Sequence, residues 1–398
     1  MPMADTGNRR RRLGPVGSVG HELFRAHVGC RILTKFPIHG AIGNLPGDGQ
    51  HETTTIMSRN GAGKARGSGR ATLEEVAGLA GVSIMTASRA LSQPRLVSDA
   101  TRARVEQAVA ELGYVPNRAA RALASSQSRV IVALVPSLSN VVFTAVLDGI
   151  QDAIAEGQYQ LLIGNTHYSD AEEEKLLRTY LQSNPDGILL SSLAHSPEVT
   201  RMLEGSRIPT VSMMDLADDT ARLTVGFSQL DAGSAMTRHL IARGYRRIAF
   251  IGAQLDERTL RRADGYRQAM RAAGLFDPAL EIMVADPSTI ALGAELMQRA
   301  LQTLPAVDAV FCCNDDLAHG AIYYCQRHGV KVPGDVAIAG FNDLPASAWM
   351  VPSLTTIDTP RYRIGYEAAT LLVDLLAGRE PHATRVDLGF TLREREST

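Results

Sequence analysis

The stretch TLEEVAGLAGVSIMTASRAL, residues 72–91, predicts two short helices joined by a tight turn. Thr72 is followed three positions later by Glu75, which makes a capping box in which each side chain satisfies a free N–H of the first helical turn. Gly81 can take the left-handed conformation that ends the first helix, and Ser83 is a good N-cap for the second. This helix-turn-helix pattern makes double-stranded DNA the first partner to consider.

The second predicted helix is the candidate recognition helix. In a helix-turn-helix this helix lies in the major groove, and its N-terminal residues reach base edges. The candidates for base reading are Ile84, Met85 and Arg89. Short hydroxyls suited to phosphate oxygens, which position the domain without specifying sequence, are those of Thr72, Ser83, Thr86 and Ser88. Two helices joined by a glycine turn also occur in proteins that never touch DNA, so the pattern alone leaves a purely structural role open.

A third predicted helix runs to Leu112 and is followed by GYVPNRAARALASSQS, residues 113–128. Pro116 and Asn117 can open a short Ala-rich helix there, ending near Leu123. Roughly 12 to 15 residues are needed for even marginal helicity in isolation. We therefore expect this hinge segment to become ordered only when it has a partner.

Together, TLEEVAGLAGVSIMTASRAL and VSDATRARVEQAVAELGYVPNRAARALASSQS (97–128) look like the N-terminal module of the LacI/GalR family of bacterial repressors. In that family two hinge helices pair in the minor groove, and each wedges a leucine into the central base step. The resemblance gives this wedge role to Leu123 and places Asn117 and Arg118 in the same hinge. Such a wedge kinks DNA at a cost of roughly a few kcal/mol, which is offset by contacts with the bent DNA. The chain departs from the family at Ser92, where asparagine is usual.

Length and charge fit a DNA-binding module attached to a larger core. The chain has 398 residues, enough for two or three domains, and 45% of them are hydrophobic. The net charge of −1 conceals an asymmetry: residues 1–126 hold 17 Lys and Arg against 9 Asp and Glu, whereas residues 127–398 hold 24 against 33. The basic end predicts a DNA affinity that falls with salt, while the acidic remainder argues against DNA wrapping the whole molecule.

Residues 1–70 are rich in Gly and Arg and show weak periodicity, so we expect a mostly disordered basic leader. The arginine run at 9–12 is a candidate DNA-contacting arm. The alternative is that the leader is dispensable or an artefact of start-site assignment, with Met57 as a natural start.

Several classes of protein are disfavoured. The cysteines Cys30, Cys312, Cys313 and Cys325 show no metal-ligand spacing, so we expect reduced thiols in a cytoplasmic protein and no metal site. No stretch approaches the roughly 18 apolar residues that span a bilayer, and the N-terminus lacks the apolar run of a signal peptide. We find no Gly-rich phosphate loop, nucleophile elbow or paired metal motif, and therefore expect neither an enzyme nor a cofactor.

From Arg129 onward, predicted strands alternate with helices. VIVALVP (130–136) is a continuous apolar run typical of a buried parallel strand, and a helical stretch followed by YQLLIG (159–164) completes a βαβ unit. Further strands of this kind are GILLSS (187–192), PTVSM (209–213), RIAFIG (247–252), DAVFCC (308–313) and VAIAGF (336–341). We expect an α/β core of two parallel sheets covered by helices, with a ligand beyond the carboxyl ends of the strands.

Residues 128–392 resemble the effector-binding core of the LacI/GalR family, which itself looks like periplasmic sugar-binding proteins: two lobes joined by three crossings, with a ligand between them. The strongest stretch is NDDLAHGAIYYCQRHGVKVPGDVAIAGFND (314–343), followed by PSLTTID. By position, the resemblance places Arg258, Asn314 and Asn342 at the cleft, with Phe143 and Asp215 from the other lobe. Arg, Asn and Asp are directional partners for a polyol, since hydroxyls both donate and accept.

Each of these residues has a less specific interpretation. Asparagine at a strand end is often a loop cap, and Arg258 in DERTLRR can be one of several solvated helix charges. The single tryptophan, Trp349, can stack on a sugar ring, but packing near a domain crossing is the commoner role.

The leading effector hypothesis is gluconate. Many family members have aspartate where Asn342 stands, and replacing a carboxylate by an amide removes repulsion toward an anionic ligand. PSLSNVVFTAVLDGI (136–150), together with MTASRAL and GFND, looks most like the gluconate-utilisation repressors of the family. The alternative is a sugar phosphate, another sugar or a purine acting as inducer or co-repressor, and a more distant one is a solute-binding receptor.

The expected organisation is a leader (1–70), a helix-turn-helix domain (71–116), a hinge helix and linker (117–127), a core for effector binding and dimerisation (128–392) and a tail (393–398). We expect a homodimer whose two DNA-binding units read the halves of a pseudo-palindromic operator while the paired hinges kink its centre. Effector binding is expected to shift the lobes and separate the hinges.

Overall fold

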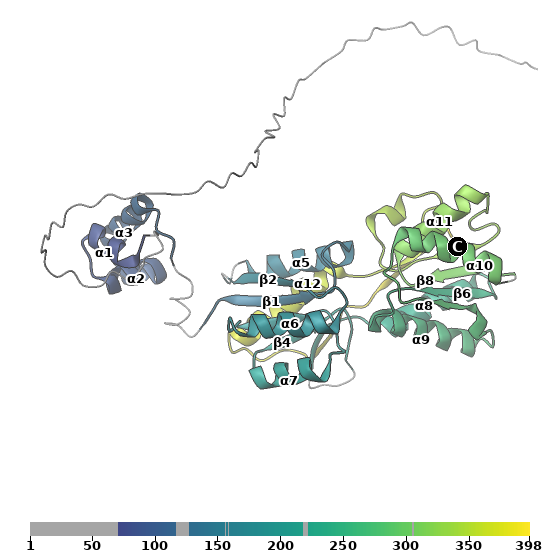
Figure 1. Ribbon diagram of the computed structural model, residues 1–398, viewed down its shortest axis with the longest axis horizontal. Coiled ribbons are helices and arrows are strands. Elements are labelled where there is room, and N and C mark those ends of the chain that lie inside the picture. Colours follow the sequence, from purple (N-terminus) through teal and green to yellow (C-terminus); the bar gives the residue numbers. More distant parts are fainter. Residues whose placement is uncertain (1–70, 117–126, 156, 158, 218–221, 305) are drawn as a thin grey trace, which may run out of the picture. The chain divides into compact units, whose positions relative to one another are not determined.

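The computed structural model describes residues 71–116, 127–155, 157, 159–217, 222–304 and 306–398. They form a small helical domain and an α/β core of two lobes (Figure 1). The leader and the hinge residues Asn117, Arg118 and Leu123 lie outside the described residues.

The helical domain consists of α1 (Leu73–Ala80), α2 (Ile84–Ser92), the short 3-10 turn η1 (Pro94–Leu96) and α3 (Asp99–Leu112). Both halves of the capping box are present: the Glu75 N–H donates to Thr72 Oγ1 (3.2 Å), and the Thr72 N–H donates to Glu75 Oε2 (2.8 Å). Gly81 ends α1 with a φ of 63°. Val76, Ala87 and Val105 are fully buried where the three helices meet.

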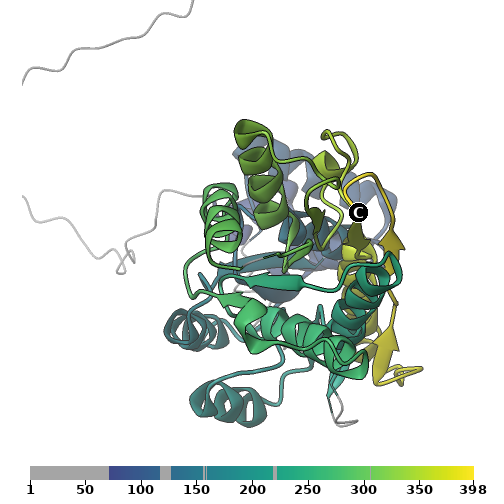
Figure 2. The same cartoon turned by 90° about the vertical axis from the view of Figure 1, so that its right-hand side faces the viewer.

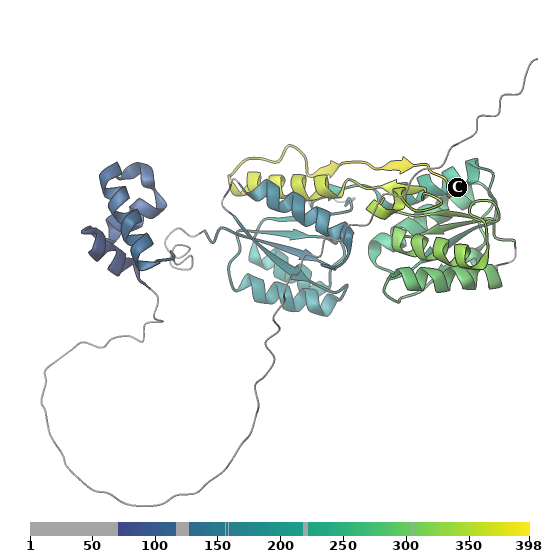
Figure 3. The ribbon, with the colours of Figure 1, turned by 90° about the horizontal axis from the view of Figure 1, so that it is seen from above.

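The first lobe is built on a six-stranded parallel sheet in the order β11-β5-β4-β3-β1-β2. Its strands are β1 (Val130–Val135), β2 (Gln160–Asn165), β3 (Gly187–Leu190), β4 (Thr210–Met213), β5 (Leu223–Gly226) and β11 (Arg385–Asp387). One face is covered by α5 (Val141–Ile154) and α12 (Arg361–Leu376), which pack together, and the other by α6 (Asp170–Leu181) and α7 (Pro197–Ser206) (Figure 3).

The second lobe has a four-stranded parallel sheet in the order β7-β6-β8-β9. Its strands are β6 (Ile248–Gly252), β7 (Glu281–Met283, after the 3-10 turn η2, Pro278–Leu280), β8 (Ala309–Cys312) and β9 (Ala337–Ala339). The helices are α8 (Gln229–Ala242) paired with α9 (Glu257–Ala272), and α10 (Ile290–Thr303) paired with α11 (Asp315–His328). Figure 2, in which this lobe faces the viewer, shows a helix pair on each side of the sheet.

In both lobes an aspartate accepts hydrogen bonds from two successive backbone N–H groups just ahead of the first strand. The carboxylate of Asp186, just before β3, accepts the backbone N–H groups of Ser128 (2.8 Å) and Arg129 (3.1 Å) ahead of β1. In the second lobe the carboxylate of Asp308, just before β8, accepts the N–H groups of Arg246 (2.8 Å) and Arg247 (2.9 Å) ahead of β6. Each aspartate therefore fixes where the first strand of its lobe starts.

The chain passes between the lobes three times, from β5 to α8, from β10 (Thr356–Asp358) to α12, and from β11 to β12 (Thr391–Arg393). β10 and β12 pair as an antiparallel ribbon, and the 3-10 turn η3 (Pro345–Ala348) lies ahead of β10. The last residues, which the sequence analysis set apart as a tail, pack into the second lobe. Ser397 is fully buried and donates to the Ile338 carbonyl oxygen (2.6 Å).

Candidate functional site

The exposed surface of α2 carries the residues predicted to read bases. Ile84 and Met85 are 50% and 63% exposed in the first turn of the helix, and Arg89 is exposed one turn later. Ala87 and Ala90 face the core instead. Two large apolar side chains left in solvent contribute little to folding, which is typical of a contact surface.

The hydroxyls predicted to contact phosphates are partly used for capping. Thr72 Oγ1 accepts the Glu75 N–H, and Ser83 Oγ accepts the Thr86 N–H (3.1 Å). A hydroxyl that accepts one hydrogen bond keeps its own O–H to donate, so capping and phosphate binding are compatible. Ser83 Oγ and Thr86 Oγ1 also share one hydrogen bond (2.9 Å), which uses the O–H of one of the two. Ser88 is exposed. Ser92, which departs from the family, donates to the Ser88 carbonyl oxygen (2.8 Å) and so bonds within its own helix.

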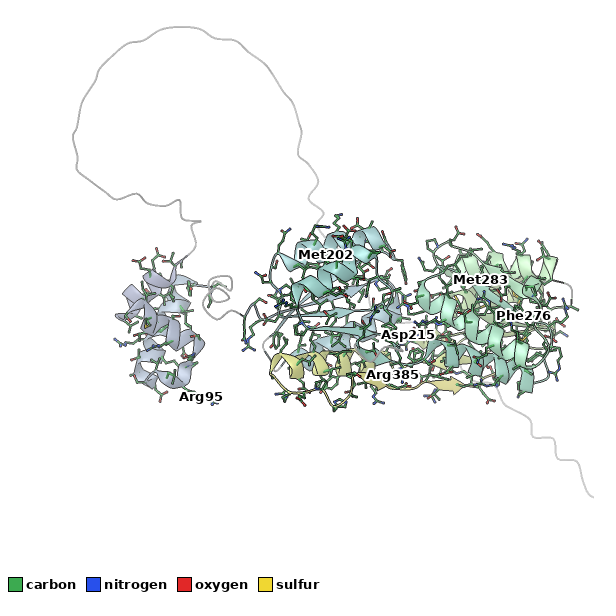
Figure 4. The ribbon with its side chains drawn as sticks, turned by 90° about the horizontal axis from the view of Figure 1, so that it is seen from below. Arg95, Met202, Asp215, Phe276, Met283 and Arg385 are labelled. Atoms are coloured by element: carbon green, nitrogen blue, oxygen red, sulfur yellow. The ribbon has the colours of Figure 1, made fainter. Side chains whose placement is uncertain are left out.

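A cavity of about 500 Å³ lies between the lobes at the carboxyl ends of the strands. Four of the five predicted effector residues line it: Phe143, Arg258, Asn314 and Asn342. Asp215, the fifth, is not among the residues that line this cavity. It lies at the side of the first lobe that faces the second (Figure 4), is 4% exposed, and forms an ion pair with Arg261 (3.3 Å). Burial raises the pKa of its carboxyl.

Arg258 bridges the lobes. Its guanidinium lies over the ring of Phe143, 5.1 Å from the centroid, and donates to Asp256 Oδ2 from Nη2 (2.5 Å). Asp256 also caps α9 by accepting the Thr259 N–H (2.9 Å). Burial alone would raise the pKa of Asp256, but the Arg258 charge and the Thr259 N–H outweigh it and hold the pKa at about 2.

Arg262, one turn beyond Arg258, is a cleft residue that the sequence analysis missed. Its guanidinium stacks on Phe341 at 3.8 Å, donates from Nε to Gln229 (2.8 Å) and from Nη1 to the Cys313 carbonyl oxygen (2.7 Å). No carboxylate oxygen of a described residue lies within 4.0 Å of the Arg262 guanidinium nitrogens. Burial lowers its pKa to about 10, so it stays charged at neutral pH. The helical spacing of four from Arg258 was the signal that could have found it.

The two asparagines differ in how far their side chains are already used. Asn314 caps α11 by accepting the Leu317 N–H (3.1 Å) and exchanges hydrogen bonds with Ser288, so its capping role holds alongside its place in the cleft wall. The Asn342 side chain is 6% exposed and has no hydrogen bond to another described residue. Its amide is therefore available to a ligand.

The cleft wall contains strained backbone. Five non-glycine residues that line it have positive φ: His167 (52°), Tyr168 (56°), Met214 (80°), Gln254 (70°) and Asn342 (112°). Such conformations persist only where the surrounding structure enforces them, and they cluster at ligand sites. Tyr168 is a further cleft residue absent from the sequence prediction; burial raises its pKa.

Trp349 does neither of the things suggested by the sequence. It is 87% exposed, follows η3, and is not among the residues lining the cavity. Trp349 therefore neither lines the cavity, where it could stack on a sugar, nor packs inside the protein. Among the residues described, there is also no cluster of His, Cys, Asp and Glu suited to a metal ion, and no helix with the length and apolar character to cross a membrane.

Comparison with known proteins agrees with both parts of this description. Residues 72–117 match the bacterial regulatory proteins of the lacI family, and residues 237–398 match the periplasmic binding protein-like domain. The HTH-type transcriptional regulator GntR of Pseudomonas aeruginosa is 51% identical over 333 residues, which cover 84% of this chain and 97% of the relative. The chain belongs to the LacI family. The predicted resemblance is thereby confirmed.

Solved structures place this LacI-family protein in the same group. The transcription regulator GntR from Chromobacterium violaceum is 51% identical, with a TM-score of 0.66 over 67% of this chain and 98% of that one. A LacI-family transcriptional regulator from Silicibacter pomeroyi is 35% identical, with a TM-score of 0.76 over 82% of this chain and 99% of that one. The predicted fold, an α/β two-lobe core behind a helix-turn-helix, is confirmed. These relatives are transcriptional regulators, and this LacI-family protein is a DNA-binding transcriptional regulator.

Proposed function

We propose that this LacI-family regulator represses transcription as a homodimer bound to a pseudo-palindromic operator and releases it when a small sugar acid, D-gluconate, binds in the cleft. The exposed side chains of Ile84, Met85 and Arg89 read base edges in this scheme. Leu123 of the hinge supplies the minor-groove wedge, with Asn117 and Arg118 beside it.

The observation that carries the choice of a sugar acid is Arg262. A buried guanidinium without a carboxylate partner among the described residues favours an anionic ligand, and its Nη2 group is not used in the bonds to Gln229 and Cys313. The charge of Arg258 is already balanced by its ion pair with Asp256, and its guanidinium contacts the Phe143 ring of the other lobe. We therefore assign the ligand carboxylate to Arg262.

The rest of the cleft suits hydroxyl groups. The Asn342 amide can donate and accept, and Asn314 and Ser288 present an amide and a hydroxyl side by side. Asp316 also lines the cavity and can accept from hydroxyls. The lining holds the carboxylates of Asp256 and Asp316 as well as the guanidinium groups of Arg258 and Arg262. Because Arg262 forms no ion pair with a described residue, a polyol that carries one carboxylate suits this cleft better than an uncharged sugar.

The test is thermal unfolding of the purified protein with D-gluconate, beside 6-phosphogluconate, glucose, ribose and purines. A ligand at a hundred times its dissociation constant adds about 2.7 kcal/mol to the native state, which moves the midpoint by several degrees. We expect a shift with gluconate that Arg262→Lys abolishes. Arg267→Lys is the matched control, because Arg267 lies on the same helix but pairs with Glu281 away from the cleft. A shift of the midpoint with another compound, but not with gluconate, would identify that compound as the effector instead. No shift at millimolar gluconate would reject gluconate as the effector.

The response must be reciprocal if effector and operator are coupled through two states of the protein. If gluconate weakens operator binding by a given factor, the operator must weaken gluconate binding by the same factor. Equilibrium titrations of gluconate with and without operator DNA measure this directly. Unequal factors would contradict a two-state repressor, whereas tighter operator binding with ligand would make the effector a co-repressor.

A further inference from the structure

Arg361 joins the two lobes beside the cleft without forming part of the cavity wall described above. It is the first residue of α12, which packs on α5 and the first-lobe sheet. Its side chain reaches the loop after β9 in the second lobe. There Nη1 donates to the Asn342 carbonyl oxygen (2.8 Å) and Nη2 to the Asp343 carbonyl oxygen (3.1 Å).

The two residues held in this way have unusual backbone conformations. Asn342 has a φ of 112° and Asp343 a φ of 51°, and neither is glycine. A non-glycine residue in this region is strained and needs outside contacts to stay there. The Asn342 N–H donates to the Ile357 carbonyl oxygen (2.8 Å), and the Asp343 carboxylate pairs with Arg395 (2.8 Å). Arg361 donates to both carbonyl oxygens, and Thr359 Oγ1 adds a longer hydrogen bond to that of Asn342 (3.5 Å).

We infer that Arg361 is a positioning residue for the effector site, holding the Asn342–Asp343 turn in the left-handed conformation that presents the Asn342 amide to the cleft. The inference rests on the proposed function, because it takes this cleft as the effector site. A planar fork with two N–H donors suits two successive carbonyl groups, whereas an ammonium group cannot reproduce that geometry. Because the fork spans the two lobes, a shift of one lobe against the other changes how Asn342 is presented.

The variants Arg361→Met and Arg361→Lys test this assignment by gluconate titration. We expect Arg361→Met to bind gluconate about tenfold more weakly, and Arg361→Lys to fall between it and the unchanged protein, since hydrogen bonds to a charged group are being removed. Arg363→Met is the matched control, because Arg363 is exposed two residues further along the same helix. If Arg361 acts through Asn342, then Arg361→Met has no further effect on affinity in an Asn342→Ala background. Independent, additive losses would overturn the inference.

A second measurement does not depend on the ligand. Amide hydrogen exchange of the segment 340–345, in the ligand-free protein, should be faster in Arg361→Met and Arg361→Lys and unchanged in Arg363→Met. Unchanged exchange in both Arg361 variants would overturn the positioning role whatever the effector. If the unchanged protein binds no gluconate but exchange is faster in both Arg361 variants, gluconate is rejected as the effector and the positioning role of Arg361 is retained.

Discussion

The guanidinium of Arg258 in the second lobe lies 5.1 Å from the centroid of the Phe143 ring in the first lobe. Neighbouring residues of α9 make further contacts between the two lobes. Glu257 Oε2 accepts the Ala194 N–H (2.9 Å), and Arg261 pairs with Asp215 (3.3 Å). The first two turns of α9 thus hold the lobes in the arrangement that assembles the cleft, and Asp215 belongs to this interface.

Glu257→Ala should weaken binding of the proposed effector, gluconate, about fivefold, because it removes a hydrogen bond to Ala194 and a partner of Arg261 (2.8 Å) while leaving the cavity wall intact. With the lobes less firmly held, only a fraction of the protein is ready to bind, and the apparent affinity falls by that fraction. Isothermal titration calorimetry measures this apparent affinity for gluconate. Glu198→Ala is the control, since Glu198 pairs with Arg178 and Arg201 inside the first lobe. Equal losses in both variants would refute the role of Glu257.

Asp256 should make stability depend on pH in the acid range. Its folded pKa of about 2 is below the unfolded value of 3.8, so its stabilising contribution is complete above pH 4 and is lost as pH falls toward 2. The difference corresponds to about 2 kcal/mol. Asp256→Asn keeps a good helix N-cap but cannot titrate. Unfolding midpoints measured from pH 5 to pH 2 should fall less steeply in this variant, and parallel curves would contradict the assignment.

Ile84→Ala and Met85→Ala should change operator preference with little effect on stability. Both side chains are at least half exposed, and surface substitutions change the free energy of unfolding by no more than about 0.5 kcal/mol. Loss of a base-edge contact costs about 1–3 kcal/mol at the base pair concerned. Selection from a randomised operator library, read beside thermal unfolding, measures both quantities. An unchanged preferred sequence in both variants would remove these residues from base reading.

The contrast between the two functional regions shows what sequence can predict. The helical domain is specified by local signals: Thr72 and Glu75 cap α1, and Gly81 ends it, each within four residues of its partner. The cleft is assembled from segments far apart in the chain. The spacing of four from Arg258 places Arg262 on the same face of α9, but the contacts of that face with Gln229 and Phe341 come from distant segments that the local sequence does not specify.

The positions of Asp215 and Trp349 illustrate the same limit. The family resemblance placed Asp215 at the cleft, but only the packing of α9 shows that Arg261 is its partner. Trp349 follows a four-residue 3-10 turn, whose local pattern says nothing about exposure. Seven core strands, by contrast, could be placed in advance as apolar runs between helical stretches: β1, β2, β3, β4, β6, β8 and β9. The short strands β5, β7, β10, β11 and β12, of three or four residues each, were not predicted.

Gly149→Ala should destabilise the first lobe strongly. A Cβ atom at this position would lie 2.1 Å from the Tyr362 carbonyl oxygen of α12, and a backbone atom in a packed helix cannot move aside cheaply. We expect a loss of about 3 kcal/mol. Gly205→Ala in α7 is the control: its Cβ meets nothing within 4 Å, and the substitution should stabilise by about 0.5 kcal/mol. Urea unfolding measures the stability of both variants. If Gly149→Ala and Gly205→Ala unfold at similar urea concentrations, α5 and α12 can move apart to accept the Cβ atom and the prediction is wrong.

In the proposed homodimer, Trp349→Glu should weaken dimerisation about a hundredfold, or about 3 kcal/mol, the size of effect expected if this tryptophan lies in the interface. Trp349 and Val351 are 87% and 76% exposed, and the Gln326 side chain of α11 bonds to the Val351 carbonyl oxygen, so this apolar loop is fixed on the second lobe. An exposed large apolar surface held in place favours contact with a second copy of the chain. Sedimentation velocity measures the dimer constant. Leu260→Glu, on the opposite helix layer of the lobe and 42% exposed, should leave it unchanged. A Trp349→Glu protein that dimerises as tightly as the parent would move the dimer contact away from this loop.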